Sequence, residues 1–281
     1  MENSIKVVSI VGPTASGKTK LSVELAKHFN GEIVSADSMQ IYSGMQIATA
    51  KPTKAEMDGV PHHMMGFLPP DKTYSVASYV TDASKCIADI HSRGKLPFIV
   101  GGTGLYVDSL LNNISFSDDK RDEEYCSKLR KIGEEDGTDR LLDMLSEFDP
   151  ESAQRLREGR NIKRIIRAIE FYKTTGKTIT EQIKESHNIP SPYSAVKLGL
   201  NCRDRQVLYD RINRRVDIML DEGLLEEAQR VINSELSYTS VKAIGYKELI
   251  PYFKGSKSLN DCVEKLKMET RRYAKRQITW F

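Results

Sequence analysis

The chain of 281 residues is 39% hydrophobic and 29% charged, and its formal net charge at pH 7 is +3. A chain of this length can bury the core of one large domain or two, and it contains no run of about 18 apolar residues that could cross a membrane. Its cysteines are widely spaced, with no CxxC pair, so we expect free thiols in a reducing cytoplasm and neither bound zinc nor secretion.

The first predicted elements form a strand–loop–helix unit that would bind phosphate. An apolar, β-branched run predicts a strand over 5–11, and helical periodicity predicts a helix over 18–29. Between them lies a complete G-x-x-x-x-G-K-[ST] loop, made of Gly12, Pro13, Thr14, Ala15, Ser16, Gly17, Lys18 and Thr19. Backbone N–H groups and the helix N-terminus would hold the phosphates, Lys18 would add a full charge, and the Thr19 hydroxyl would join the shell of a Mg²⁺ ion. The sequence therefore predicts a polyphosphate or pyrophosphate site, of the kind that usually binds ATP or GTP.

Two more strands are predicted at 32–36 and 96–100, and each is followed by a candidate site residue. The first strand ends in Asp37, and the second runs into a glycine turn that contains Thr103. In a parallel sheet the carboxyl ends of the strands converge on one crevice, so both side chains are candidates to share a site with the phosphate-binding loop. The alternatives are a helix cap or turn role for Asp37 and a turn role for Thr103. No Asp stands at the tip of strand 96–100, where an NTPase would hold its Mg²⁺.

The rest of the chain divides into a helical stretch and a return of the α/β pattern. A helix is predicted over 75–93, after a predicted loop with His62 and His63, and a charged, strand-poor region opens at 118–120. Amphipathic periodicity then predicts helices over 122–136, 138–147, 151–157, 161–175 and 178–185. A strand at 195–200 precedes predicted helices over 205–222, 224–233, 243–253, 259–269 and 270–280. We therefore predict an α/β fold, in which a P-loop NTPase-like parallel sheet core, residues 1–112 and 195–281, contains an inserted all-helical module at 113–194.

Charge is distributed unevenly along the chain. Residues 115–150 contain six Lys and Arg against twelve Asp and Glu, whereas residues 151–215 contain fifteen against seven. Two helices of the basic stretch carry clusters of cations. The first has Lys163, Arg164, Arg167 and Lys173, with Arg164 and Arg167 on one side, and the second has a similar set, Arg211, Arg214 and Arg215. Guanidinium groups on such a face suit binding to phosphates. The basic stretch therefore predicts a surface that binds nucleic acid, with solvated helix faces as the alternative.

Several further motifs, taken together with the phosphate-binding loop, indicate a known family. In chain order they are Asp37-Ser38-Met39-Gln40-Ile41-Tyr42, Thr49-Ala50-Lys51-Pro52, Pro61-His62-His63, Gly101 to Tyr106, Arg160-Asn161, Thr175-Gly176-Lys177, Arg211-Ile212-Asn213, Gly245-Tyr246-Lys247-Glu248, Lys275-Arg276-Gln277 and Thr279-Trp280-Phe281. In this combination and order, which covers essentially the whole chain, the sequence resembles the bacterial tRNA dimethylallyltransferases, also called tRNA isopentenyltransferases. One departure is Ala48, which stands where the family usually has Gly.

The resemblance implies an activity and roles for the candidate residues. Members of this family transfer a dimethylallyl group from dimethylallyl diphosphate to N6 of the adenosine at position 37, in the tRNA anticodon loop, and they release diphosphate. Asp37 would then be the general base, and Thr103 would contact either the acceptor base or a donor phosphate. The departing diphosphate would be stabilised by Lys18, by a Mg²⁺ ion held at Thr19, and by Arg215 or Arg211.

The resemblance also implies which residues contact the tRNA. Those expected around the flipped base are Asp37, Ser38, Met39, Gln40 and Thr103. Those expected to hold the anticodon stem and loop are Asn161, Lys163, Arg164, Arg167, Arg276 and Gln277. We expect a cytoplasmic enzyme that works as a monomer. Three alternatives stay open from the residues alone: a small-molecule kinase, a prenyltransferase that acts on a free adenylate, and a non-catalytic RNA-binding protein.

Overall fold

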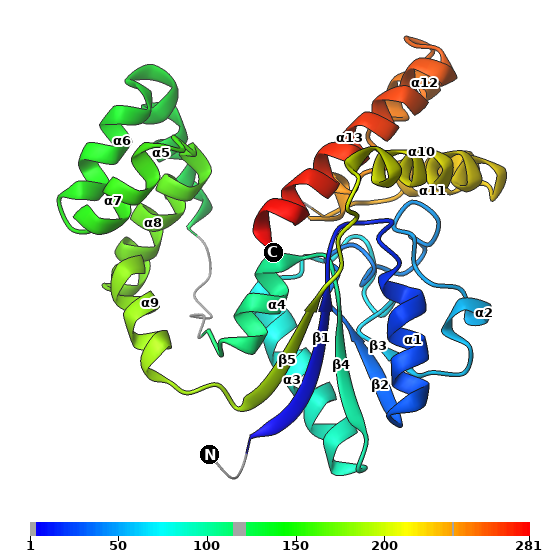
Figure 1. Cartoon of the computed structure of the whole chain (residues 1–281). Helices are drawn as coiled ribbons and strands as arrows, with labels where there is room; N and C mark the ends of the chain where they lie inside the picture. The colour runs from blue at the N-terminus through cyan, green and yellow to red at the C-terminus, as the bar shows by residue number, and fades with distance from the viewer. Residues whose placement is uncertain (1–3, 115–121, 238) are drawn as a thin grey trace. The chain divides into compact units, whose positions relative to one another are not determined.

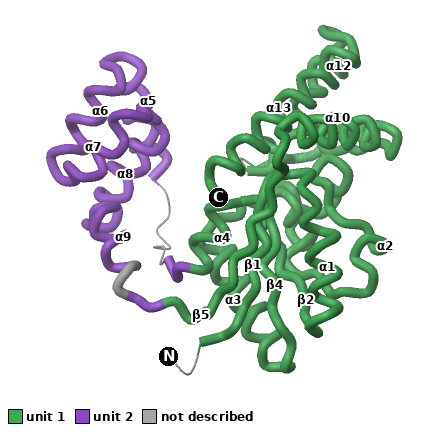
Figure 2. The backbone as a smooth tube through the Cα atoms, in the orientation of Figure 1, with its two compact units in different colours: residues 1–111, 191–281 green, residues 112–190 purple. Residues whose placement is uncertain are grey.

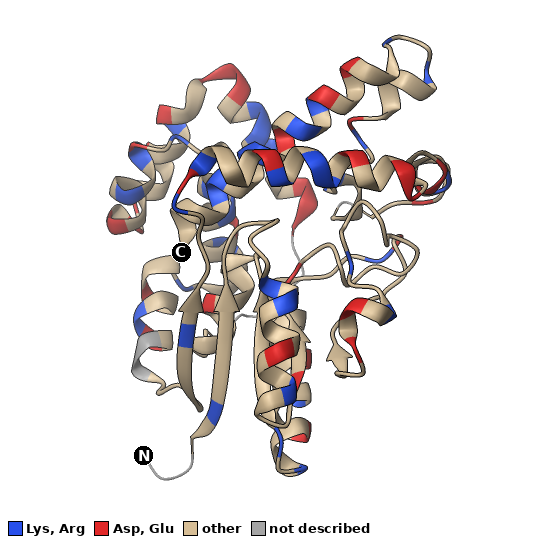
Figure 3. Ribbon diagram, turned by 45° about the vertical axis from the view of Figure 1, so that its right-hand side comes forward, with Lys and Arg blue, Asp and Glu red and all other residues tan. Residues whose placement is uncertain are grey.

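The structure is a computed structural model that describes residues 4–114, 122–237 and 239–281. The charged region predicted to open at 118–120 lies outside the described residues. The Lys, Arg, Asp and Glu positions fall mainly on the helices, and the strands carry few of them (Figure 3). No helix among the described residues is both long and apolar enough to cross a membrane.

The chain divides into two compact units, which Figure 2 distinguishes by colour. We call the first, residues 1–111 together with 191–281, the core unit, and the second, residues 112–190, the helical unit. Each unit has a buried apolar cluster of its own. The chain therefore leaves the core unit once, forms the helical unit, and returns to complete the core unit.

A five-stranded parallel sheet forms the centre of the core unit (Figure 1). Its strands are β1 (Ile5–Val11), β2 (Gly31–Ser35), β3 (His62–His63), β4 (Leu96–Gly101) and β5 (Tyr193–Gly199). They lie in the order β3-β2-β4-β1-β5, and every pair is parallel. This confirms the predicted parallel sheet. The prediction of a loop at the histidine pair is wrong, because these two residues pair with β2 as the short edge strand β3. The carboxyl ends of β1, β4 and β2 are neighbours, which brings three loops to one edge.

Helices cover both faces of the sheet. The first ones in the chain are α1 (Lys18–His28), α2 (Lys54–Met57), α3 (Val76–Ser92) and α4 (Gly104–Leu111). Neighbouring residues of β1 face opposite sides of the sheet. Ile10 shares a buried cluster with Val23 of α1, whereas Val11 shares another with Ile87 of α3. The phosphate-binding loop and the turn after β4 are thus supported from both sides by packed apolar residues.

The later helices of the core unit correct two predictions. They are α10 (Arg205–Asp221), α11 (Leu224–Ile232), α12 (Ile250–Phe253) and α13 (Leu259–Trp280). A helix over 243–253 is wrong for most of its length, because Gly245 has a φ of +111° and the chain turns there before α12 begins. A Cβ at Gly245 would lie 2.7 Å from the Cβ of Ala48, so this turn also needs glycine for close approach. The two helices predicted over 259–280 are one continuous helix, α13.

The helical unit consists of five helices around its own core. They are α5 (Glu123–Glu135), α6 (Gly137–Ser146), α7 (Pro150–Arg157), α8 (Ile162–Thr175) and α9 (Ile179–Asn188). Leu129, Leu141 and Ile165 are fully buried and belong to one cluster. Polar side chains cap helices of this unit at their N-termini: Asp149 accepts the N–H of Ser152 in α7, and Asn161 accepts that of Arg164 in α8. All five helices were predicted from amphipathic periodicity.

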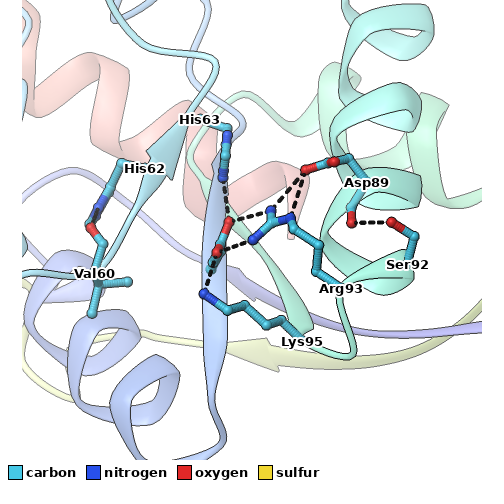
Figure 4. Close-up of polar contacts among 8 residues, drawn as sticks. Val60, His62, His63, Asp89, Ser92, Arg93 and Lys95 are labelled. Atoms are coloured by element: carbon cyan, nitrogen blue, oxygen red, sulfur yellow. Dashed lines mark hydrogen bonds and ion pairs between the residues drawn. The ribbon is translucent and has the colours of Figure 1, made fainter.

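A buried carboxylate on β2 joins three segments of the core unit (Figure 4). Glu32 is 2% exposed, and its Oε1 accepts hydrogen bonds at 2.6 Å from Arg93 Nη1 and from Lys95 Nζ. Its Oε2 accepts hydrogen bonds at 2.7 Å from Arg93 Nη2 and from His63 Nε2. The hydrogen bonds from Arg93, with those from Lys95 and His63, hold the pKa of this carboxyl well below its usual value although burial opposes the shift.

Glu32→Gln is expected to lower the free energy of unfolding by about 1–3 kcal/mol near neutral pH, because the amide loses charge-assisted hydrogen bonds from three partners. Since the folded-state pKa is lowered, the stabilisation is complete above the usual carboxyl pKa of 4.5 and is lost as the pH falls toward the folded-state value. Urea unfolding should therefore show a difference between wild type and variant that shrinks in acid. Glu24→Gln, at an exposed position of α1, is the matched control. Equal losses for the two variants would contradict the prediction.

Candidate active site

The phosphate-binding loop connects β1 to α1. Gly17 caps α1 with a φ of +92°, a backbone conformation that favours glycine. At Gly12, a Cβ would lie 2.4 Å from the carbonyl oxygen of Leu200, so glycine is also required for close approach to the segment after β5. The first turn of α1 carries no acidic residue. Its free N–H groups and the positive end of its dipole are therefore available to an anion.

Lys18 lies folded back over the loop that precedes it. Its Nζ donates hydrogen bonds to the carbonyl oxygens of Gly12, at 2.9 Å, and Pro13, at 2.7 Å. Burial lowers the pKa of Lys18 to about 8, the nearby carboxylate of Asp37 opposes this shift, and the charge of Arg215 adds to it. A bound anion would stabilise the charged amine and raise the pKa again. The lysine is therefore a desolvated cation that gains from phosphate binding.

Asp37 follows β2, and only one of its two carboxylate oxygens accepts hydrogen bonds from the described residues. Oδ1 accepts hydrogen bonds from the backbone N–H of Met39, at 2.9 Å, and of Gln40, at 3.3 Å. Oδ2 accepts no hydrogen bond from the part of the chain that the structure describes. The charges of Lys18 and Arg215 are close enough to interact with this carboxylate. Asp37 thus has a fixed orientation and one free oxygen beside the phosphate-binding loop.

Thr103 fastens the turn after β4 to the segment that carries Asp37. Its N–H donates to the carbonyl of Ala36 at 3.1 Å. Its Oγ1 accepts a hydrogen bond from the N–H of Ser38 at 3.0 Å and donates to the Ser38 hydroxyl at 3.4 Å. A Cβ at Gly101 would lie 2.2 Å from the Ala36 oxygen, so the two strand ends meet only because glycine stands there.

A cavity of about 980 Å³ in the core unit connects the phosphate-binding loop to Asp37, and Thr103 is not among its lining residues. Lys18, Thr19, Asp37 and the α13 residue Tyr273 all line it. Its apolar lining residues include Ile47, Met65, Met219 and Leu266. A pocket that joins a phosphate cradle, a carboxylate and an apolar wall can bind a diphosphate ester with a hydrocarbon tail beside a polar acceptor.

The two arginines that were candidates for the diphosphate both line this cavity. Arg215 is half-buried, and burial lowers its pKa while the charges of Glu56, Asp37 and Glu222 raise it. Among the described residues, no hydrogen bond or ion pair engages its guanidinium. Arg211 is exposed, and its Nη1 lies 3.8 Å from Cys202 Sγ. Arg215 is the desolvated, unpaired cation of the two, so it has more to gain from a bound anion.

The residues that follow Asp37 already make contacts within the protein. Met39 is half-buried and packs against the cluster beneath α11. Gln40 donates both amide hydrogens, to the carbonyls of Thr49 at 3.2 Å and Ala50 at 3.1 Å. Ser38, Met39 and Gln40 all line the cavity. Gln40 can therefore accept a hydrogen bond from a ligand at its Oε1, but it can donate one only after it breaks one of these two bonds.

Three residues that shape the site were not predicted. Tyr273 lies beside Thr103 and Gln277, and its pKa is raised by burial and by the charge of Asp37. Lys51 lines the cavity and donates to the carbonyl of Tyr42 at 2.7 Å. Tyr273 could have been found because it precedes Gln277 by four residues, which places both on one helix face. Lys51 could have been found in its Thr-Ala-Lys-Pro motif.

The third unpredicted residue, Glu227, had no signal in the sequence. It is 2% exposed, and its carboxylate accepts hydrogen bonds from the N–H groups of Gln46, Ile47 and Ala48 at 2.8 to 3.0 Å. The hydroxyl of Tyr246 donates to it at 2.9 Å. Glu227 of α11 thus fixes the backbone of a segment that lines the cavity.

Within the helical unit, the candidate tRNA contacts lie together on α8 but differ in their partners. Asn161 is the N-cap, and its side chain accepts the N–H of Arg164 at 3.2 Å. Lys163 and Arg164 are exposed, and no described side chain pairs with either. Arg167 forms an ion pair with the buried Glu170 and lies over the ring of Phe171. Lys163 and Arg164 are therefore the cations of this set that are free for phosphate.

Fold and site together define a P-loop α/β protein whose phosphate cradle opens into an apolar pocket with a carboxylate. A family model described as IPP transferase matches residues 40–281, and one described as isopentenyl transferase matches residues 5–65. The chain belongs to the tRNA dimethylallyltransferase family.

Known relatives are similar over nearly the whole length of this chain. A tRNA dimethylallyltransferase of Halalkalibacterium halodurans is 50% identical over 98% of this chain and 88% of its own. The crystal structure of the full-length tRNA isopentenylpyrophosphate transferase from Bacillus halodurans matches with a TM-score of 0.70 and 46% identity, over 98% of this chain and 86% of that one. A eukaryotic dimethylallyltransferase acting on tRNA matches with a TM-score of 0.81 and 33% identity, over 99% of this chain and 70% of that one.

Proposed function

We infer that this chain transfers a dimethylallyl group from dimethylallyl diphosphate to N6 of the adenosine at position 37 of tRNA. The observation that carries this inference is one cavity of the core unit, whose lining includes the phosphate-binding loop, Asp37 and an apolar wall. Membership of the tRNA dimethylallyltransferase family supplies the substrates. The bond from the allylic carbon to oxygen breaks, the bond from that carbon to N6 forms, and diphosphate leaves.

Asp37 is proposed as the group that accepts the proton from N6. The exocyclic amine is a weak nucleophile because its lone pair is delocalised into the ring, so removal of a proton as the new bond forms assists the reaction. The free Oδ2 of Asp37 suits this role, since Oδ1 is held by two backbone N–H groups. Thr103 supports the role by fixing Ser38, the residue after Asp37.

The diphosphate would be held by the loop of residues 12–17, the first turn of α1, Lys18 and Arg215. Negative charge on the leaving oxygen grows as the carbon–oxygen bond breaks, so these cationic groups stabilise the transition state more than the ground state. The buried Ser16 hydroxyl, which has no partner among the described residues, is a further donor for a phosphate oxygen.

A Mg²⁺ ion is proposed beside the diphosphate. The Thr19 hydroxyl lines the cavity next to Lys18, and Mg²⁺ is commonly held by few protein ligands together with phosphate oxygens and water. The residues present fit such a site. The ion would supply Lewis-acid stabilisation of the leaving group when bound.

The acceptor base is proposed to enter near Asp37, Ser38 and Met39, and the rest of the tRNA to contact both units. Chemistry on a loop base requires that the base leave its stack. Arg276, exposed on α13 with its guanidinium over the Tyr273 ring, is a candidate for the phosphate backbone near the cavity. Lys163 and Arg164 are candidates in the helical unit. We propose a monomeric enzyme of the cytoplasm.

One assay distinguishes this function from the alternatives. Labelled dimethylallyl diphosphate is offered with tRNA, with AMP, or with no acceptor. Label is expected in tRNA alone, at the adenosine of position 37. Label in AMP would instead indicate a prenyltransferase that acts on free adenylates. If label reached neither acceptor, the remaining alternatives would be a non-catalytic RNA-binding protein or a small-molecule kinase.

Arg164→Ala is expected to raise the dissociation constant for tRNA and to flatten its dependence on salt. Each phosphate contact contributes about 0.7–0.9 to the slope of log affinity against log salt, so loss of one contact lowers the slope by nearly one. Filter binding over a salt series measures it. Lys128→Ala, which removes an exposed lysine of α5 paired with Glu124, is the control. Arg167→Ala should instead destabilise the helical unit, because the buried Glu170 keeps the N–H of Asp122 but loses its ion-pair partner. An unchanged salt slope for Arg164→Ala would show that Arg164 does not contact an RNA phosphate.

A further inference from the structure

Gln277 is buried in the core unit and its amide joins two loops of the active site. Its side chain projects from α13, and the residue is 5% exposed. Oε1 accepts a hydrogen bond at 2.8 Å from the backbone N–H of Thr14, in the phosphate-binding loop. Nε2 donates a hydrogen bond at 3.0 Å to the carbonyl oxygen of Gly102, in the turn after β4. The side chain expected to contact tRNA is therefore already engaged at both ends.

The turn after β4 packs closely against this amide, which also lines the cavity. A Cβ at Gly102 would lie 2.0 Å from Gln277 Nε2, so the turn can approach the amide only because it has glycine there. The next residue, Thr103, holds the segment of Ser38 and Asp37. The amide thus bridges the loop that would bind the donor and the turn that positions the proposed general base.

We propose that Gln277 is a positioning residue for the transfer reaction, which fixes the distance between the diphosphate cradle and the Asp37–Thr103 group. This inference rests on the proposed roles of those two regions. The bridge needs one acceptor and one donor, because its partners are an N–H and a carbonyl, and the amide of Gln277 offers one atom for each without a change of protonation. The reacting carbon and N6 must be held within a narrow range of distance, and a displacement of about 1 Å can cost roughly a hundredfold in rate.

The consequence is a defined kinetic signature. Loss of the bridge should lower the rate of the chemical step while both substrates still bind. A residue that touches tRNA would give the opposite result, a raised dissociation constant with a normal rate at saturation. Single-turnover rates at saturating tRNA and donor, together with tRNA binding by filter assay, separate the two.

Gln277→Met keeps the length of the side chain and removes both hydrogen bonds. Its single-turnover rate is expected to fall by about 10- to 100-fold, with a tRNA dissociation constant within about twofold of wild type. Lys275→Met, at an exposed position two residues earlier, is the matched control for the change in side chain and should retain the rate. Wild-type transfer to tRNA in the same assay tests the proposed function independently of Gln277.

Gln277→Glu adds a readout that a merely structural role would not give. Its ionised carboxylate accepts from Thr14 but repels the Gly102 oxygen, whereas its protonated form has one acceptor and one donor, as the amide has. The rate relative to wild type should therefore rise as the pH is lowered through the pKa of the buried carboxyl, which burial raises. This variant also covers the case in which Gln277→Met fails to fold.

Recovery of Gln277→Glu in acid, with near-normal tRNA affinity, supports the proposal. A rate ratio to wild type that does not change with pH overturns it. A raised tRNA dissociation constant with a normal saturated rate also overturns it and returns Gln277 to the RNA contacts.

Discussion

Asp37→Asn is expected to lower the single-turnover rate of prenyl transfer by about 10² to 10⁴, the usual contribution of a general base. The amide oxygen can still accept the N–H groups of Met39 and Gln40, so the local backbone should keep its conformation. What is lost is the basic oxygen, Oδ2, which no described residue engages. The change therefore isolates proton transfer from folding.

The affinity of Asp37→Asn for tRNA should stay within about twofold of wild type, because contacts along the anticodon arm do not involve this carboxylate. Rapid-quench transfer assays and filter binding measure the two quantities on one preparation. Asp58→Asn, which changes an exposed aspartate paired with Lys27, controls for the substitution itself. A near-normal single-turnover rate for Asp37→Asn would make Asp37 a turn residue and remove it from the chemistry.

Lys18→Ala is expected to weaken donor binding and to slow transfer by about 10² to 10³, the usual loss when one stabilising group for a developing oxyanion is removed. Its pKa of about 8 adds a pH signature. The amine is charged below that pH and neutral above it, so wild-type kcat/KM for the donor should fall as the pH rises through about 8. The fall reflects loss of the cation that meets the diphosphate.

In Lys18→Ala this limb of the profile should disappear, because the titrating amine is gone. Lys20→Ala removes an exposed lysine from the same helix and should keep both the rate and the limb. Neither wild type nor variant should need or consume ATP. Stoichiometric hydrolysis of ATP during turnover would instead favour a small-molecule kinase.

Most of the fold could be predicted because its signals are local. The strand–loop–helix unit around residues 12–17 and the helices of the helical unit can be predicted from the periodicity of apolar residues and from residues that cap helices. The turn at Gly245 was missed because its φ serves a close approach to Ala48, a neighbour distant in sequence. The pair His62–His63 was missed for the same reason, since a strand of two residues exists only through its pairing with β2.

The same distinction, between local signals and contacts distant in sequence, applies to the candidate site. The structure brings Lys18, Asp37 and Arg215 to one cavity, as the phosphate-binding motif, the strand ends and the family resemblance suggested. Charge pattern alone could not separate Arg164, which is free, from Arg167, which Glu170 engages. The buried carboxylate of Glu227 gave no signal, because a glutamate on an amphipathic helix is ordinarily a solvated one.

Glu227 and Gln277 also set the order in which a working enzyme can appear during translation. Glu227 holds Ile47 across 180 positions of the chain, and Gln277 holds Thr14 across 263. The loops that receive the donor and the base are thus synthesised early, but their partners leave the ribosome much later. A nascent chain can fold its strands and its helical unit while the catalytic loops still lack these anchors. On the roles proposed for these loops and for Gln277, we expect an unfinished chain to be inactive toward the tRNAs around its ribosome.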